Sequence, residues 1–146
     1  MMKKTVVQVI FVLLLPLIFC RILFAQNESY TPKEKRAQKA SEEWLSLVDK
    51  GDYAASWQET SENFKSSFTK KKWVNSLENI RRPLGKVLRR ALTGINHNAA
   101  LPGSTDSEYI DLIYETSFAK HKNTVETITV RKDKDRQWRV IRYHIR

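Results

Sequence analysis

The sequence is poor in the residues that covalent frameworks and repetitive proteins need. It contains one cysteine, four glycines and four prolines among 146 residues. A single cysteine excludes an intramolecular disulfide framework, and no cysteine–histidine spacing indicates a structural zinc site. So little glycine and proline excludes collagen-like and low-complexity proteins. The hydrophobic share of 41% is that of a folded chain rather than a disordered tail, and the length predicts one domain.

Catalytic and cofactor motifs are also missing. The chain has no Gly-x-Ser-x-Gly elbow, glycine-rich phosphate loop or dinucleotide fingerprint. The three histidines, His97, His121 and His144, are far apart and lack a metal-binding spacing, so we expect them in turns or on the surface. The sequence therefore predicts no metal and no cofactor.

The first 25 residues have the pattern of a secretory signal peptide. A cationic start and a long apolar stretch lead to Ala25, after which we expect cleavage. The alternative is a retained signal anchor, because the apolar stretch is almost long enough to span a bilayer. Pro16 and Arg21 disfavour a stable span. Cleavage would remove Cys20 and lower the formal charge of +10 by three. The mature protein is then periplasmic or secreted, with membrane contact only through this segment if it stays uncleaved.

Three helices are predicted between residues 26 and 83. Residues 26–36 are a polar lead-in followed by a helix start, where Thr31 and Glu34 have the spacing of a capping box. The second helix begins after Asp52 and continues towards Phe64. Each helix has its own N-cap residue: Thr31, Asp52 and Thr69. Gly51 ends the first helix and Pro83 ends the third. Apolar residues recur at helical spacing after each cap, on the third helix at Trp73, Val74, Leu77 and Ile80.

The second half of the chain predicts four strands. They span about residues 86–96, 108–119, 124–132 and 138–145, with a loop near 98–107. The second strand alternates clearly, because Ile110, Leu112, Tyr114, Thr116 and Phe118 share one face. Helices followed by antiparallel strands predict an α+β fold, with three N-terminal helices packed on a curved four-stranded antiparallel sheet.

Several short stretches together resemble a bacterial protein family. They are Glu43-Trp44-Leu45, Val48–Tyr53, Ser56-Trp57, Trp73 followed by Arg81–Gly85, Leu101-Pro102-Gly103, Tyr114–Phe118, Val125-Glu126-Thr127 and Trp138-Arg139-Val140 with Tyr143. On these the chain resembles the domain of unknown function 4019 (DUF4019) family, over residues 37–146 as a single domain. Its members are mostly short exported proteins without established catalytic residues, so the resemblance implies export and carries over no site. The element order also resembles the cone-like fold of cystatin and nuclear transport factor 2 (NTF2).

Glu126 is the candidate catalytic residue. In the third strand it shares a face with Ile128 and Val130, so we expect it to point at the core or into a pocket. An unpaired buried carboxylate would have a raised pKa and would be a candidate general base. The alternative is a structural ion pair, because an isolated buried charge is costly. The candidate partners are Arg82, Arg89, Arg90 and Arg139.

Large aromatic residues either line a ligand cavity or fill the core. The set comprises Trp44, Trp57, Trp73, Tyr114, Phe118, Trp138 and Tyr143. In a cone-like fold these side chains would meet above the sheet. Core packing is the favoured interpretation, because residues of this size dominate small cores.

The excess of positive charge suggests an anionic partner. Arg142, His144 and Arg146 alternate in the last strand and would form a cationic row. Export argues against nucleic acid, so an anionic component of the cell envelope fits better. A solvated basic surface without a specific partner is the favoured interpretation of the charge. Our leading hypothesis is a non-enzymatic exported binding domain of the envelope. The alternatives are an enzyme of the ketosteroid-isomerase type with Glu126 as its base, and binding of anionic envelope surfaces through the basic face.

Overall fold

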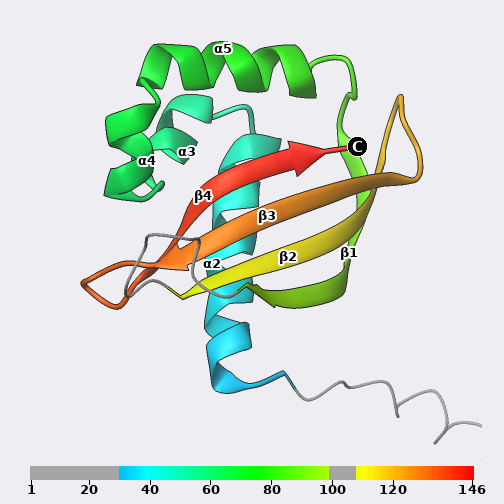
Figure 1. Ribbon diagram of the computed structural model, residues 1–146. Helices are drawn as coiled ribbons and strands as arrows, with labels where there is room; N and C mark the ends of the chain where they lie inside the picture. The colour runs from blue at the N-terminus through cyan, green and yellow to red at the C-terminus, as the bar shows by residue number, and fades with distance from the viewer. Residues whose placement is uncertain (1–29, 99–107) are drawn as a thin grey trace, which may run out of the picture. The chain divides into compact units, whose positions relative to one another are not determined.

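Four helices precede four strands in the part of the chain that the computed structural model describes, residues 30–98 and 108–146 (Figure 1). The helices are α2 (Pro32–Asp49), α3 (Tyr53–Gln58), α4 (Glu62–Ser67) and α5 (Lys70–Arg81). The strands are β1 (Val87–Asn98), β2 (Tyr109–Phe118), β3 (Thr124–Lys132) and β4 (Trp138–Ile145). The predicted α+β class is confirmed. The predicted signal peptide and its cleavage site after Ala25 lie outside the described residues.

The helix starts follow from local capping. The Thr31 hydroxyl accepts the Glu34 backbone N–H, and the Glu34 carboxylate accepts the Thr31 N–H at 2.7 Å, which completes the predicted capping box of α2. Asp52 caps α3 and Thr69 caps α5. Each cap supplies an acceptor to a backbone donor that has no partner within the helix.

The prediction of one helix that continues from Asp52 towards Phe64 was wrong, because this segment forms two short helices, α3 and α4. Thr60 forms a parallel bridge to Val140 on β4, and the Ser61 N–H donates to the Val140 carbonyl at 3.2 Å. The Ser61 hydroxyl then accepts the Phe64 N–H and starts α4. A tertiary contact with the edge of the sheet thus interrupts the helix, and the described chain has four helices where three were expected.

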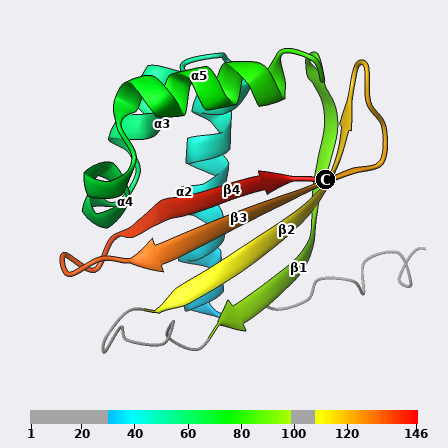
Figure 2. The ribbon, with the colours of Figure 1, turned by 45° about the horizontal axis from the view of Figure 1, so that its top comes forward.

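The four strands form one antiparallel sheet in the order β1-β2-β3-β4. Register shifts near Leu92 and Gly94 in β1, and beside Thr129 in β3, mark irregularities that bend such strands. Figures 1 and 2 show α2 crossing one face of the sheet, with α3, α4 and α5 grouped on the β4 side. The face of the sheet that points away from α2 carries no described helix.

The core lies between α2, α5 and the helix-covered face of the sheet. The alternation expected for β2 is confirmed, because Ile110, Leu112, Tyr114, Thr116 and Phe118 are all buried. Trp44 and Leu45 of α2 and Leu77 of α5 pack against them. Ile80 was expected on the apolar face of its helix, but its side chain is 43% exposed.

We predict that Gly51→Ala destabilises the protein through backbone strain alone. Gly51 has φ +79°, and an added Cβ would meet nothing within 4 Å. A left-handed alanine costs about 1–2 kcal/mol, so the free energy of unfolding in urea should fall by about that amount. Gly94→Ala is the control, since that residue is not left-handed and its Cβ would make an ordinary 3.5 Å contact with Ile113. Equal losses of unfolding free energy in both variants would contradict the role of the left-handed backbone at Gly51.

Candidate functional site

Glu126 lies at the centre of a buried polar network. Its side chain is 0% exposed, and each carboxylate oxygen accepts two hydrogen bonds. Arg81 Nη1 and the Tyr143 hydroxyl donate to Oε1, at 3.0 and 2.5 Å. Arg90 Nε and the Thr116 hydroxyl donate to Oε2, at 2.6 and 2.5 Å. Four donors from four different elements therefore satisfy this carboxylate.

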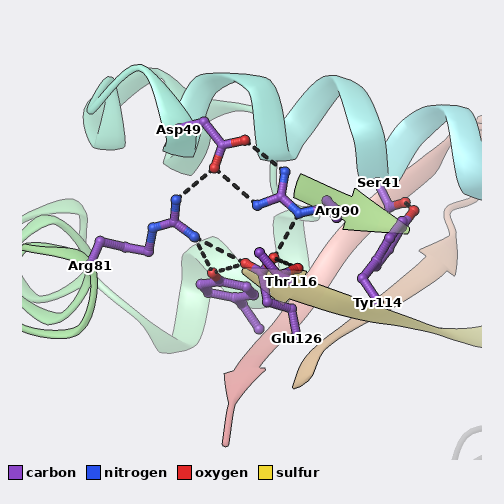
Figure 3. A network of polar contacts seen from close by, with 8 residues as sticks. Ser41, Asp49, Arg81, Arg90, Tyr114, Thr116 and Glu126 are labelled. Atoms are coloured by element: carbon purple, nitrogen blue, oxygen red, sulfur yellow. Dashed lines mark hydrogen bonds and ion pairs between the residues drawn. The ribbon is translucent and has the colours of Figure 1, made fainter. Parts of the chain in front are cut away.

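Asp49, the last residue of α2, extends the network towards solvent. Its Oδ1 accepts from Arg81 Nη2 at 2.6 Å and from Arg90 Nη2 at 3.0 Å, and its Oδ2 accepts from Arg90 Nη1 at 2.6 Å. Figure 3 shows both guanidinium groups between Asp49 and Glu126. Two cations thus face two anions, and the Asp49 side chain is 27% exposed while that of Arg81 is 4% exposed.

Burial and pairing together determine the ionisation of this network. Burial acts to lower the pKa of Arg90, but hydrogen bonds and charge attraction from Asp49 and Glu126 outweigh it and raise that pKa further above its ordinary value. Burial, with the nearby Glu126 charge, raises the pKa of Tyr143 well above its ordinary value. Both groups therefore stay protonated and act as donors to the carboxylate.

The ion-pair interpretation of Glu126 is supported, but its partners were only partly foreseen. Arg90 was an expected partner and is one. Arg82 and Arg89 are exposed, and Arg139 pairs instead with Asp133 and Asp135. Arg81 was not among the predicted partners, and its side chain also lies over the Phe118 ring at 4.6 Å.

A signal for the missed residues was present in the helical spacing. Arg81 follows Trp73 and Leu77 at intervals of four, and Asp49 follows Leu45 by four. Residues at these intervals share a helix face, so both charged side chains continue an apolar stripe that faces the sheet. A charge in such a position indicates a buried ion pair.

This arrangement does not favour general-base chemistry at Glu126. A base must be within hydrogen-bond reach of a substrate proton, whereas this side chain is fully buried. Four protein donors already occupy its two oxygens. The network has the chemistry of a structural link between helices and sheet.

Most of the aromatic residues in the predicted set lie in the hydrophobic core. Trp44, Trp73, Tyr114, Phe118 and Trp138 are buried, and Trp57 and Tyr143 are partly buried against the core. The Trp44 ring lies 5.9 Å from that of Trp73 and 5.2 Å from that of Tyr143. Trp57 lies towards α4, where its indole N–H donates to the Phe68 carbonyl. Core packing is thus the better interpretation, although Tyr114, Trp44 and Trp138 also border open grooves.

Two open grooves flank α2. The α2–β1 groove, of about 470 Å³, is lined by Gln38, Glu42, Leu45, Ser46, Asp49, Lys50, Arg90, Leu92 and Tyr114. The α2–β4 groove, of about 430 Å³, is lined by Ala40, Glu43, Trp44, Leu47, Glu59, Gln137, Trp138, Arg139 and Val140. Of these two, only the α2–β1 groove reaches the buried network, through Asp49 and Arg90. A third groove, of about 230 Å³, borders the same network at Thr116.

The remaining candidate residues do not form a common site. His97 contacts the Glu34 carboxylate at 2.8 Å, and His121 and His144 are exposed elsewhere. Within residues 30–98 and 108–146, no three His, Cys, Asp or Glu side chains are arranged to hold a metal ion. Arg142 and His144 lie side by side with Thr129 and Thr127 on the face of the sheet that points away from α2, and Arg146 follows β4.

No helix in the described part of the chain has the length and hydrophobicity needed to cross a membrane.

A family model with the description "Protein of unknown function (DUF4019)" matches residues 40–143. The chain belongs to the DUF4019 family. The predicted family is thereby confirmed, and the matched range contains every residue of the Glu126 network. A comparison with curated proteins gives no match.

In this DUF4019 protein, Glu126→Gln should be strongly destabilising. It leaves the buried Arg81 and the partly buried Arg90 guanidinium groups with one carboxylate, and breaking a buried pair costs about 3–5 kcal/mol. Tyr143→Phe removes one donor of four and should cost about 1.5–3 kcal/mol, the range for a hydrogen bond to a charged group. Urea unfolding measures both changes.

Glu115→Gln is the matched control, because Glu115 is an exposed acid on β2 and should change stability by less than about 0.5 kcal/mol. A Glu126→Gln variant as stable as the Glu115→Gln variant would contradict the structural role of the network.

Proposed function

We propose that this protein is an exported, non-enzymatic binding domain of the cell envelope. The observation that carries the proposal is the α2–β1 groove, which opens beside the Glu126 network. The Glu126 carboxylate is fully buried and already accepts hydrogen bonds from the protein at both oxygens, so it is not available as a general base. Binding sites of small molecules are typically preformed concave surfaces with an apolar floor and a few fixed polar groups. The groove has this composition.

The floor and the rim of the α2–β1 groove differ in chemistry. Leu45 and Tyr114 are buried and Leu92 is half-buried, so they supply apolar surface. Glu42 and Lys50 are exposed charged residues of opposite sign on the α2 side. The groove is therefore suited to a small amphipathic molecule, with its apolar part on the floor.

The walls of the groove are held in place by hydrogen bonds. The Tyr114 hydroxyl lies 2.6 Å from that of Ser41, and burial raises its pKa to about 12, so it stays protonated. Arg90 is fixed to Asp49 and Glu126. Groups fixed in this way bind a ligand at a lower entropic cost than mobile groups do.

Anilinonaphthalene sulfonate, an amphipathic fluorescent probe, tests the groove. We expect its addition to shift the amide NMR signals of Leu92 and Tyr114. Ser46→Trp places a large side chain at the groove and should weaken probe binding at least about tenfold, the factor that corresponds to about 1.4 kcal/mol.

Asn75→Trp is the matched control, because Asn75 is exposed on α5 and does not line the groove. It should leave probe affinity unchanged. Shifts spread over other surfaces, or equal weakening by the two tryptophan variants, would contradict a site in this groove.

Export rests on the pattern of residues 1–25, with a cationic start, an apolar stretch and a small residue at the end. Mass spectrometry of the full chain expressed in a bacterium should find a periplasmic or secreted protein that begins at Gln26. Ala25→Arg should block cleavage and leave the precursor with the membrane fraction. A mature protein that retains Met1 in the cytosolic fraction would overturn the proposal of export.

A cone-like fold similar to that of NTF2 and cystatin forms part of this proposal. It is supported by the antiparallel strand order and by the helix across one face of the sheet. Fold similarity does not imply a shared activity, and the ketosteroid-isomerase alternative needs an accessible base, which the buried Glu126 does not offer.

A further inference from the structure

Two turns meet at one end of the sheet. The connection from α5 to β1 (residues 82–86) contacts the β2–β3 turn (residues 119–123). The Lys120 N–H donates to the Leu84 carbonyl at 3.0 Å, and the Ala119 N–H donates to the Lys86 carbonyl at 2.8 Å. Figures 1 and 2 both show these turns at the same end of the molecule.

This end carries cations that have no acidic partner among the described residues. Five exposed side chains, which we call the basic end, are Arg82, Lys86, Arg89, Lys120 and Lys122. None of them forms an ion pair within residues 30–98 and 108–146. The exposed acids nearest to them along the helix and strands are Glu78 and Glu115, so positive charge predominates.

Exposed apolar side chains flank the same connection. Leu88, the second residue of β1, is 66% exposed, and Ile80, in the last turn of α5, is 43% exposed. They are the two large hydrophobic residues classed as exposed in the described chain. An exposed leucine among unpaired cations is typical of a surface that binds a bilayer, because apolar side chains enter the interface while cations contact the headgroups.

We propose that the basic end docks on an anionic lipid bilayer. Each lysine or arginine near such a surface strengthens binding by about fivefold, and Leu88 with Ile80 adds apolar contact. A single-stranded nucleic acid would use the cations but not these aliphatic side chains, because it stacks its bases on aromatic residues instead. The basic end is distinct from the α2–β1 groove, so this proposal does not rest on the proposed function of that groove.

Vesicle co-sedimentation tests the proposal with the chain that begins at Gln26, which contains the whole compact unit Thr31–Arg146. We expect binding to vesicles containing phosphatidylglycerol and none to pure phosphatidylcholine vesicles. The triple variant Lys86→Glu, Lys120→Glu and Lys122→Glu should weaken binding on the order of 100-fold. Leu88→Ser should weaken the binding that persists at high salt, where the electrostatic contribution is screened.

A second triple variant, Lys70→Glu, Lys71→Glu and Lys72→Glu, changes net charge by the same amount at the start of α5. Those lysines are exposed and form no ion pair among the described residues, and acidic residues are favourable at a helix N-terminus. This variant should retain most of the binding. Thermal unfolding checks that every variant is folded.

If the two triple variants lost vesicle binding equally, net charge alone would explain the binding, and the proposal would be overturned. Absence of binding to anionic vesicles would overturn it as well. Displacement from vesicles by a single-stranded oligonucleotide or by soluble glycerophosphate, through the same three lysines, would identify a soluble anion as the partner instead. Failure of the export or groove tests would leave these results unaffected, because the vesicle measurement uses purified protein.

Discussion

The buried Glu126 carboxylate is the constraint on which the rest of the structure depends. Through Arg81 it holds α5, through Arg90 it holds β1, and its Thr116 and Tyr143 contacts connect β2 and β4 to β3. Asp49 joins α2 to both arginines. Two helices and four strands thus meet at one charge-balanced centre. Removing one partner from such a centre leaves an uncompensated buried charge, which costs more than the loss of a surface pair.

The same centre explains why an acid in a buried position is not evidence of catalysis here. Glu126 was the candidate general base, but the protein itself supplies the donors that a substrate would have to provide. Only Asp49 and Arg90 bring the network to the α2–β1 groove. The ion pairs connect the two walls of the α2–β1 groove, which is the proposed binding site, and the proposed docking surface, the basic end, lies outside it.

Local signals in the sequence were sufficient for much of the fold. The caps at Thr31, Asp52 and Thr69 mark helix starts, and the alternation from Ile110 to Phe118 identifies the buried face of a strand. The break before Ser61 was not predictable locally, because it depends on a contact with β4 that is distant in sequence. Arg81 was not among the predicted partners of Glu126, although its helical spacing after Trp73 and Leu77 places it on the buried face of α5.

Nitrogen-15 NMR of the arginine side chains tests the central claim most directly, since it observes the guanidinium groups in solution. A guanidinium that is hydrogen-bonded to two carboxylates cannot rotate freely or exchange its protons rapidly. Arg81 and Arg90 should therefore give separate, slowly exchanging Nη signals, whereas exposed Arg142 should give averaged ones. Averaged, rapidly exchanging signals from Arg81 and Arg90 would contradict the account.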